Sequence, residues 1–438
     1  MTRPLFIANA RLLDPATRLD ARGAILVSRA EPRGPDDCGG EILAVGPNVE
    51  APADAEVLDA GGLCLMPGLI DMRVVTGEPG AEHKETFKSA GRAAAAGGVT
   101  TLVVTPNTAP VIDDVSLVDF VLRRATARGH VRIHPSAALT KGLEGRAMSE
   151  IGLLAEAGAV LFSNGDVPIT DSRLLRRALA YASAFDALVA HRPEDPYLAA
   201  GGCMNEGEFA GRLGLPGIPA AAETIMVERD LALAELTGGR LLLDLLSSAR
   251  SLAPLERAKA RGVRAHASVS IHHLTLNELE VGDYRTFAKL SPPLRGESDR
   301  LALVEAVASG LIDVVVSGHD PRPAEDKRLP FDEAAFGAAA LETLLPGLLS
   351  LHHNGEAPLL EVLAAVTSRP AALLGLPQGR LAVGAPADLA LVNLDAPFRF
   401  DIANLRSKSR NSPFDGKLLQ GRVVRTFVGG EAVFPPQS

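Results

Sequence analysis

The sequence has no tryptophan and only three cysteines among its 438 residues. Cys38, Cys64 and Cys203 form no Cys-x-x-Cys pair, so neither a disulfide framework nor a cysteine zinc site is indicated. Residues 1–10 contain no apolar segment long enough for a signal peptide, and no window approaches the roughly 18 uninterrupted apolar residues of a membrane span. We therefore expect a cytoplasmic protein that does not bind a membrane.

The chain also lacks a run of basic residues. Its 44 Lys and Arg residues are outnumbered by 53 Asp and Glu residues, which gives a net charge of −9. This acidic excess disfavours nucleic acid and anionic membranes as partners. The 47% of hydrophobic residues excludes a disordered chain, and the composition is that of a large globular protein. Small molecules or other proteins are the expected partners.

The pattern of apolar and turn-forming residues divides the chain into three parts. Short β-type runs broken by Gly, Pro and Asp fill residues 4–60, with the longest turn at residues 31–40, and similar runs return between residues 380 and 434. Between them, apolar β-type runs alternate with Ala- and Leu-rich stretches of helical period, the pattern of parallel strands with crossover helices. We predict a (β/α)8 TIM barrel over residues 66–377, and a small β-sandwich domain formed by both chain ends, residues 1–65 and 378–438.

Eight runs are predicted to form the strands of this barrel. They cover residues 63–75, 100–107, 131–139, 160–164, 187–191, 240–247, 263–273 and 312–319. Stretches of helical period separate them at residues 84–96, 172–184, 225–237, 255–261 and 300–308. In such a barrel the chemistry lies at the carboxyl ends of the strands, so the residues there are the candidates for function.

Several motifs at those ends carry a family resemblance. They are MPGLIDMRVVTGEPG at residues 66–80, TPNT at residues 105–108, SIHHL at residues 270–274 and SGHDP at residues 317–321. In collinear order from about residue 7 to residue 433, such motifs resemble the dihydroorotase branch of the amidohydrolase superfamily. The resemblance implies a zinc-assisted ring closure and opening that interconverts N-carbamoyl-aspartate and dihydroorotate in pyrimidine biosynthesis.

The positions that match the family's metal ligands have largely changed. Its His-x-His pair after the first strand is Arg73 and Val75 here, and Gly77 replaces the arginine that binds the substrate carboxylate. Asn164 stands at the bridging aspartate of strand four, while the strand-five histidine is kept as His191. The two strand-six histidines match leucines and the strand-eight aspartate matches a glycine, the positions being Leu242, Leu245 and Gly318.

One imidazole cannot hold a catalytic zinc, which needs about three protein ligands. We therefore predict a pocket with no cofactor and no catalytic residue. Strand parity places Asp166 and Asp320 on the same side as Arg73, and we expect one of them to form an ion pair with it. The predicted vestigial pocket consists of Arg73, Val75, Gly77, Asn107, Asn164, Asp166, His191, Leu245, His272, Gly318 and Asp320.

Most of the remaining candidates have a structural interpretation. His272 and His273 are expected to pack, His191 to be a hydrogen-bonded pocket histidine, and His319 to orient a loop. Asn107 either contacts a substrate, as the resemblance implies, or caps the turn of TPNT. The run at residues 241–246 is interpreted as an aliphatic strand packed on both faces.

Three functions remain open. The first is a non-catalytic dihydroorotase-like protein that supports the assembly of aspartate carbamoyltransferase, as metal-less members of the family imply, in a homo- or hetero-oligomer. The alternative is an active dihydroorotase or other cyclic amidohydrolase, with zinc moved to His191, Asp166 and Asp320. The third is a sensor that binds a pyrimidine precursor through Asn107 without reacting. We predict the non-catalytic role.

Overall fold

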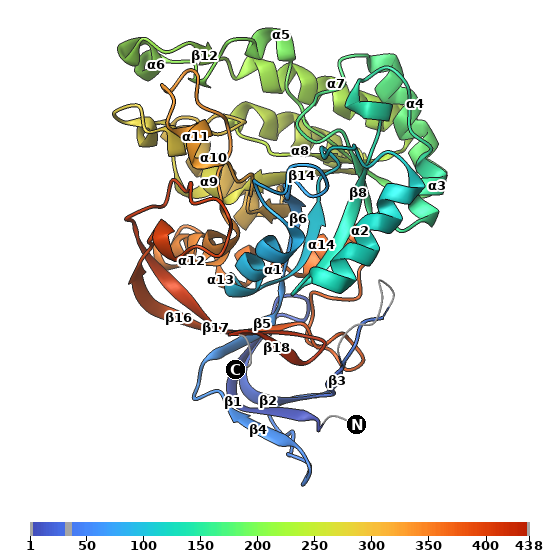
Figure 1. The fold of residues 1–438 in the computed structure, drawn as a ribbon, viewed down its shortest axis with the longest axis vertical. Helices are drawn as coiled ribbons and strands as arrows, with labels where there is room; N and C mark the ends of the chain where they lie inside the picture. The colour runs from blue at the N-terminus through green and yellow to red at the C-terminus, as the bar shows by residue number, and fades with distance from the viewer. Residues whose placement is uncertain (1–2, 31–36, 436–438) are drawn as a thin grey trace.

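The chain folds into a barrel of strands and helices with a β-sheet domain at one end (Figure 1). The computed structural model describes residues 3–30 and 37–435. Residues 31–36, which make up most of the turn predicted at residues 31–40, lie outside the described part. The predicted fold is confirmed, because the barrel is joined to a sheet that takes strands from both ends of the chain. Among the described residues, no helix is long and apolar enough to cross a membrane.

The barrel is an eight-stranded parallel sheet that follows chain order from β6 to β15. A parallel bridge between Val74 and His319 brings its first and last strands together, so the barrel is nearly closed. All the predicted barrel strands are present. Their bounds are β6 (Leu69–Val74), β7 (Val99–Val104), β8 (Arg132–Ala138), β9 (Leu161–Ser163), β10 (Leu188–His191), β13 (Arg240–Leu243), β14 (Ala265–Ser270) and β15 (Val314–Val316).

Helices between the strands surround the barrel (Figure 1). Side-chain caps fix where several of them begin: Thr86 and Ser89 form a capping box at α1, and Asp171 accepts backbone hydrogen bonds at α4. The helices are α1 (Phe87–Ala96), α2 (Val115–Arg128), α3 (Ile151–Glu156), α4 (Ser172–Ser183), α5 (Pro196–Ala199), α6 (Glu208–Leu213), α7 (Ala221–Thr237), α8 (Leu252–Ala260), α9 (Ile271–Thr275), α10 (Glu297–Ala308), α11 (Ala324–Lys327), α12 (Leu344–His353), α13 (Leu359–Ala364) and α14 (Ser368–Leu374).

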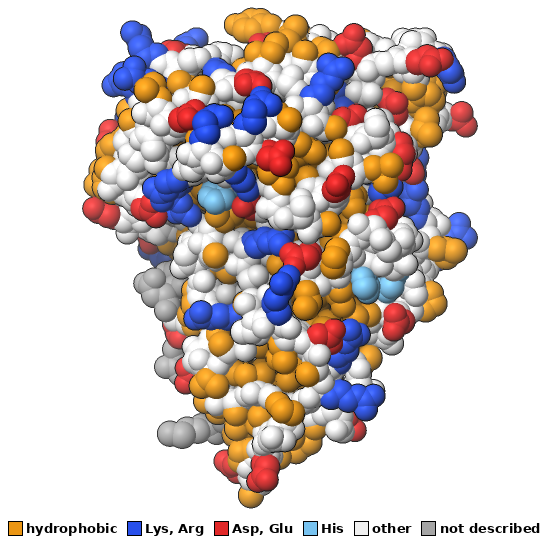
Figure 2. Space-filling model, turned by 180° about the vertical axis from the view of Figure 1, so that it is seen from behind, with side chains coloured by type: hydrophobic (Ala, Val, Ile, Leu, Met, Phe, Trp, Pro, Cys, Tyr) orange, Lys and Arg blue, Asp and Glu red, His pale blue; other side chains and the backbone are white. Residues whose placement is uncertain are grey.

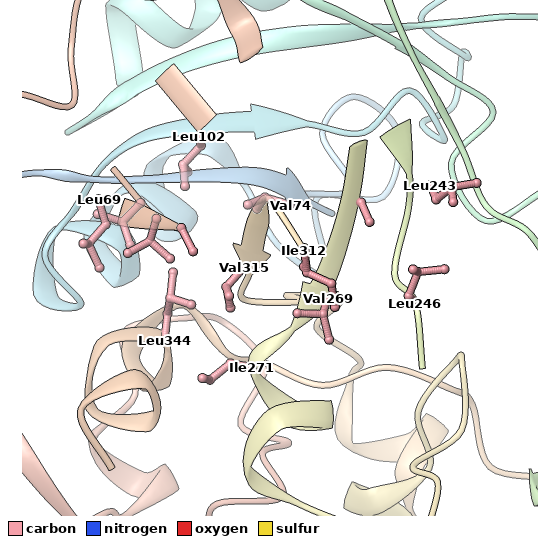
Figure 3. Packing of buried hydrophobic residues seen from close by; sticks show 14 of the residues in the cluster. Leu69, Val74, Leu102, Leu243, Leu246, Val269, Ile271, Ile312, Val315 and Leu344 are labelled. Atoms are coloured by element: carbon pink, nitrogen blue, oxygen red, sulfur yellow. The ribbon is translucent and has the colours of Figure 1, made fainter. Parts of the chain in front are cut away.

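The alternation of side chains along the strands divides the apolar core into two layers. In β13, Leu241 and Leu243 belong to the outer layer between strands and helices, whereas Leu242 belongs to the interior of the barrel. Figure 3 shows part of the outer layer, with Val315 on β15 and Leu344 on α12. The apolar part of the interior layer comprises Met72, Val103, Leu161, Leu188, Ala190, Leu242, Leu245, Val314, Val316 and Leu373. Polar side chains such as Ser136 on β8 and Ser268 on β14 alternate with outer-layer residues and therefore share this interior.

The sheet domain is one hydrogen-bonded sheet of eight strands. Its order is β18-β17-β16-β5-β1-β2-β3, with β4 paired to β1, so the first and last segments of the chain meet where β5 lies between β16 and β1. Its strands are β1 (Leu5–Asp14), β2 (Leu19–Val27), β3 (Ile42–Gly46), β4 (Glu56–Asp59), β5 (Cys64–Pro67), β16 (Leu389–Arg399), β17 (Leu418–Val428) and β18 (Glu431–Phe434). A separate pair, β11 (Met204–Asn205) and β12 (Gly217–Ile218), lies beside the barrel.

The surface carries charges of both signs. On the face drawn in Figure 2, Lys and Arg side chains are interspersed with Asp and Glu side chains over the barrel. This face therefore presents no large field of one sign.

A buried ion pair joins the barrel to the sheet domain. Arg132 at the start of β8 donates from Nε to Asp388 Oδ2 at 2.5 Å and from Nη2 to Asp388 Oδ1 at 2.9 Å. Both side chains are buried, with 8% and 1% exposed. The carboxylate also accepts a hydrogen bond from the backbone of Gly429, and the guanidinium donates to the carbonyl of Cys38. Segments from both chain ends thus meet at one barrel strand.

We expect the substitution Arg132→Met to lower the free energy of unfolding by about 3–5 kcal/mol, because it leaves the buried Asp388 carboxylate without a cation. The matched control is Arg11→Met. Arg11 pairs with Asp20, and the two side chains are 41% and 40% exposed. Such an exposed pair contributes less than about 1 kcal/mol to the free energy of unfolding. Urea unfolding followed by circular dichroism measures both variants, and equal losses would contradict a structural role for the buried pair.

Candidate functional site

A cavity of about 210 Å³ opens at the carboxyl ends of the barrel strands. Charged residues in the segments after the strands form much of its wall: Asp166 lies in the segment after β9, Arg192 directly follows β10, and Asp320 lies in the segment after β15. The residues that line it are Arg73, Asp166, Arg192, Glu194, Leu245, Ser270, His272, His273, Leu290, Ser291, Gly318, Asp320, Arg322, Phe336 and Gly337. Of the predicted pocket, Arg73, Asp166, Leu245, His272, Gly318 and Asp320 line this cavity, whereas Val75, Gly77, Asn107, Asn164 and His191 do not.

Arg73 lies near the end of β6 and is held by two carboxylates. Its Nη2 donates to Asp166 Oδ1 at 2.5 Å, and its Nε donates to Asp244 Oδ2 at 2.7 Å. The ion pair expected between Arg73 and either Asp166 or Asp320 is therefore present, with Asp166 as the partner. Burial by itself lowers the pKa of Arg73, but the two carboxylates more than offset this and raise it above its ordinary value. The guanidinium is thus a permanent, fixed cation.

Asp244 is fixed in turn by its neighbours. Its Oδ1 accepts a hydrogen bond from the Ser268 hydroxyl at 2.8 Å, and its Oδ2 accepts the one from Arg73. The interpretation of residues 241–246 as a largely aliphatic strand holds only as far as Leu243, because β13 ends there and the carboxylate of Asp244 lies just beyond it. Leu245 follows with a φ of 60° and turns its apolar side chain to the cavity.

Asp166 also pairs with a second guanidinium. Arg192 Nη1 donates to Asp166 Oδ1 at 2.9 Å, and Arg192 Nη2 donates to Ser291 Oγ at 2.5 Å. The amide of Asn107 donates to the other oxygen of Asp166 at 3.4 Å. Burial raises the pKa of Asp166, but Arg73 and Arg192 outweigh it and lower the pKa to about 2. Asp166 is therefore an ionised partner of two cations.

Asp320 has a different environment from Asp166. It does not pair with Arg73, since its Oδ2 accepts a hydrogen bond from Arg322 Nη2 at 2.6 Å. Burial raises the pKa of Asp320, Arg322 lowers it, and the negative charge of Asp166 raises it again, so that it lies above the ordinary value. The mouth therefore contains two carboxyl groups whose pKa values are shifted in opposite directions.

His191 uses both of its ring nitrogens in the protein. Nδ1 lies 2.6 Å from Asp230 Oδ2, and Nε2 accepts a hydrogen bond from the backbone N–H of Ile169 at 2.8 Å. The ring is 1% exposed and does not line the cavity. It is hydrogen-bonded, as expected from the sequence, but it lies outside the cavity, and it has no free lone pair for a metal.

The paired histidines after β14 are both buried and neutral at pH 7. His273 lies 2.7 Å from Ser270 Oγ and 3.2 Å from the Pro292 carbonyl oxygen, while His272 stacks on Phe414. Burial lowers the pKa of His272 to about 3 and that of His273 to about 4. Among the described residues, Nε2 of His272 has no hydrogen-bond partner. His319 accepts a hydrogen bond from the backbone of residue 340 and so orients its loop, as expected.

The other predicted positions support the backbone. The amide of Asn164 bonds the backbone and hydroxyl of Thr140, and the Val75 N–H bonds the carbonyl of residue 319. Gly77 has a φ of +71°, and a Cβ there would lie 2.7 Å from the carbonyl oxygen of Ala81. Gly318 has a φ of +68°, and a Cβ at this position would lie 3.0 Å from the Cβ of Ser270. The family's arginine and aspartate would strain this backbone.

The residues present do not fit the zinc that the family implies. Among residues 3–30 and 37–435, no group of three or more His, Cys, Asp and Glu side chains is placed to hold a metal ion. The alternative set of His191, Asp166 and Asp320 is not assembled, because each of these side chains already has a partner in the protein. The guanidinium of Arg73 adds a fixed positive charge that repels a cation.

Sequence reasoning missed four charged residues of the site, Asp244, Arg192, Arg322 and Glu194, the last of which lines the cavity beside Arg192. Asp244 was concealed by the leucines around it, although a single aspartate in such a run is itself a signal. Arg192 and Arg322 each lie close in sequence to a predicted site residue, His191 and Asp320 respectively. Both arginines line the cavity.

Family models match most of the chain. Residues 62–251 match the model described as dihydro-orotase-like, and residues 246–434 match that of the amidohydrolase family. The dihydroorotase of Wolbachia sp. subsp. Drosophila simulans (strain wRi) is 41% identical over 432 residues, which cover 98% of this chain and 95% of that protein. The dihydroorotase of Syntrophus aciditrophicus (strain SB) is 39% identical, covering 98% and 99%.

Solved structures support the fold. The L-hydantoinase (dihydropyrimidinase) from Arthrobacter aurescens has a TM-score of 0.86 at 24% identity, covering 99% of this chain and 96% of that chain. The dihydropyrimidinase from Brevibacillus agri NCHU1002 has a TM-score of 0.83 at 21% identity, covering 98% and 94%. At these identities the likeness concerns the architecture alone.

The relatives contradict the predicted non-catalytic role. Proteins about 40% identical over nearly the whole chain are named as the enzyme, so counting lost metal ligands was not sufficient ground for denying activity. Association with aspartate carbamoyltransferase and the oligomeric state stay predictions. By its sequence matches over almost its full length, the chain belongs to the dihydroorotase-like amidohydrolases.

Proposed function

We propose that this chain is a hydrolase of the dihydroorotase type, which opens the cyclic amide of dihydroorotate to N-carbamoyl-aspartate and catalyses the reverse ring closure. The observation that carries this proposal is the identity of 39–41% with proteins named dihydroorotase, over 97–98% of the chain. Such similarity spans the barrel, its loops and the sheet domain together. The proposed activity does not depend on zinc bound by His191, Asp166 and Asp320.

The cavity at the barrel mouth has a volume of about 210 Å³ and suits a small substrate. It is lined by three guanidinium groups, from Arg73, Arg192 and Arg322, and by the carboxyl groups of Asp166, Glu194 and Asp320. A planar guanidinium binds a carboxylate through two parallel hydrogen bonds. In Arg322, Nε donates to the carbonyl of Phe336 and Nη2 to Asp320, while Nη1 makes no hydrogen bond within the described residues. We assign the carboxylate of dihydroorotate to Arg322, because the family's arginine is replaced by Gly77.

The reaction requires two kinds of group. In ring opening, water adds to the ring carbonyl carbon, the C–N bond breaks, and the departing nitrogen gains a proton. A positive group near the carbonyl oxygen and a carboxyl group that exchanges a proton both lower this barrier. The mouth has fixed guanidinium groups and the carboxyl group of Asp320 within one cavity.

We expect the purified full-length chain to convert dihydroorotate to N-carbamoyl-aspartate and to reach the same equilibrium mixture from either side. Chromatographic separation of the two compounds over time measures both directions. The same assay with hydantoin and dihydrouracil, which lack the carboxylate, should show weaker turnover if a guanidinium binds that group. A folded chain that changes neither dihydroorotate nor N-carbamoyl-aspartate would contradict the proposed function.

We expect Arg322→Met to raise the KM for dihydroorotate by roughly 10- to 100-fold, because a hydrogen bond to a charged group contributes about 1.5–3 kcal/mol. The control is Arg257→Met on α8, which removes an exposed arginine whose partner is Glu228. Steady-state kinetics compare the two variants. An unchanged KM in Arg322→Met would show that the substrate carboxylate binds elsewhere.

A further inference from the structure

The misfit between this site and a metal ion raises the question of what acts in the metal's place. We propose that the Arg73 guanidinium polarises the scissile carbonyl where the family uses a metal ion, and that Asp320 carries the proton. This inference rests on the proposed function and assigns its mechanism. It depends on three features of the mouth: a fixed cation, a charge balance that disfavours a metal, and a carboxyl group with one free oxygen.

The fixed cation is Arg73. Two of its nitrogens are bound to carboxylates that follow two other barrel strands, Asp166 after β9 and Asp244 after β13. The remaining nitrogen, Nη1, makes no hydrogen bond within the described residues, although the side chain lines the cavity. A donor held rigidly by other contacts stabilises a developing oxyanion without reorganising during the reaction. Nη1 of Arg73 is such a donor.

The charge balance disfavours a metal ion. Both oxygens of Asp244 accept hydrogen bonds, and Asp166 is shared between Arg73 and Arg192. A divalent cation could bind these carboxylates only by displacing the guanidinium groups. It would also face the positive charge of Arg73, which is 5% exposed and therefore poorly screened by water. The carboxylates thus neutralise arginines and are not available as metal ligands.

The proton carrier is Asp320. Its Oδ2 is held by Arg322 at 2.6 Å, whereas Oδ1 accepts no hydrogen bond from the described residues. Asp320 lines the cavity. The backbone of Gly337 packs against it so closely that a Cβ on Gly337 would lie 2.6 Å from Asp320 Oδ2. One oxygen is therefore fixed and the other can reach a ligand or a water molecule.

The step balances without any co-reactant. In ring opening, the oxygen of water forms a bond with the carbonyl carbon while Asp320 takes one proton from that water. The carbonyl oxygen becomes an anion that accepts a hydrogen bond from Arg73. The C–N bond then breaks, the electron pair goes to nitrogen, and Asp320 returns its proton to that nitrogen. The new carboxylic acid releases its proton to solvent.

Metal content tests the first part directly. Protein purified without chelator should contain less than about 0.1 zinc per chain by mass spectrometry, where a bound catalytic metal gives about one. Dialysis against a chelator should leave turnover unchanged. Stoichiometric zinc, or turnover that appears only on adding a metal ion, would overturn the inference and leave the proposed function intact. Absence of turnover with and without metals would contradict the proposed function itself.

Two conservative variants test the second part. Asp320→Asn keeps an oxygen for Arg322 and should lower kcat by about 10²- to 10⁴-fold, the usual effect of losing a proton-transfer group. Arg73→Lys keeps the charge and should lower kcat by about 10²- to 10³-fold, with little change in KM. The control is Asp395→Asn, whose side chain is 87% exposed on β16 and should retain full activity.

Circular dichroism and calorimetric binding of dihydroorotate distinguish a chemical role from loss of structure. A variant that folds, binds dihydroorotate and turns over slowly supports the inference. A variant of Asp320 or Arg73 that retains wild-type kcat overturns it for that residue. If Arg73→Lys does not fold, Asp244→Asn provides the second measurement: it weakens the contact that holds Nε of Arg73 and should lower kcat, whereas an unchanged kcat would overturn the role of Arg73.

Discussion

The buried guanidinium of Arg73 determines the arrangement of the barrel mouth. It extends from β6 and binds the residues that follow β9 and β13, so one side chain connects three strands that are not all neighbours in the sheet. A charge in such a place is tolerated only when opposite charges and hydrogen bonds compensate for the lost water. Asp166 and Asp244 provide this compensation, and Asp166 in turn positions Arg192. The other charged groups of the mouth form pairs of their own, Arg192 with Glu194 and Arg322 with Asp320.

Most of the fold follows from patterns that are local in the sequence. Apolar runs of strand length separated by helical stretches are sufficient to predict the eight parallel strands, because each run must be buried on both faces. The predicted ends were less accurate. The predicted strands at residues 240–247 and 263–273 extend beyond the last paired residues, because β13 ends at Leu243 and α9 begins at Ile271. The pairing of Arg132 with Asp388 was not predicted, because it joins residues 256 positions apart.

The site was predictable only in part. Charge and strand parity were enough to predict an ion pair of Arg73 with Asp166 or Asp320, but not to choose between them, and the structure has the pair with Asp166. The same two criteria could not predict that Asp320 pairs with Arg322, because that pairing depends on the path of the loop after β15. The function illustrates a further difficulty. Residues that match a family's ligands can be replaced by groups of different chemistry, and a count of missing ligands does not reveal whether the replacements still serve the reaction.

The position of β5 has a consequence for how this protein is made. It pairs with β1 on one side and with β16 on the other, so the sheet needs segments that lie more than 300 residues apart. During synthesis the first strands emerge well before their later neighbours exist, and the whole barrel is translated in between. Pairings between such distant segments form slowly. The N-terminal strands must therefore keep an unpaired edge until the C-terminal strands have been synthesised. A chaperone that covers this edge would prevent aggregation during that period.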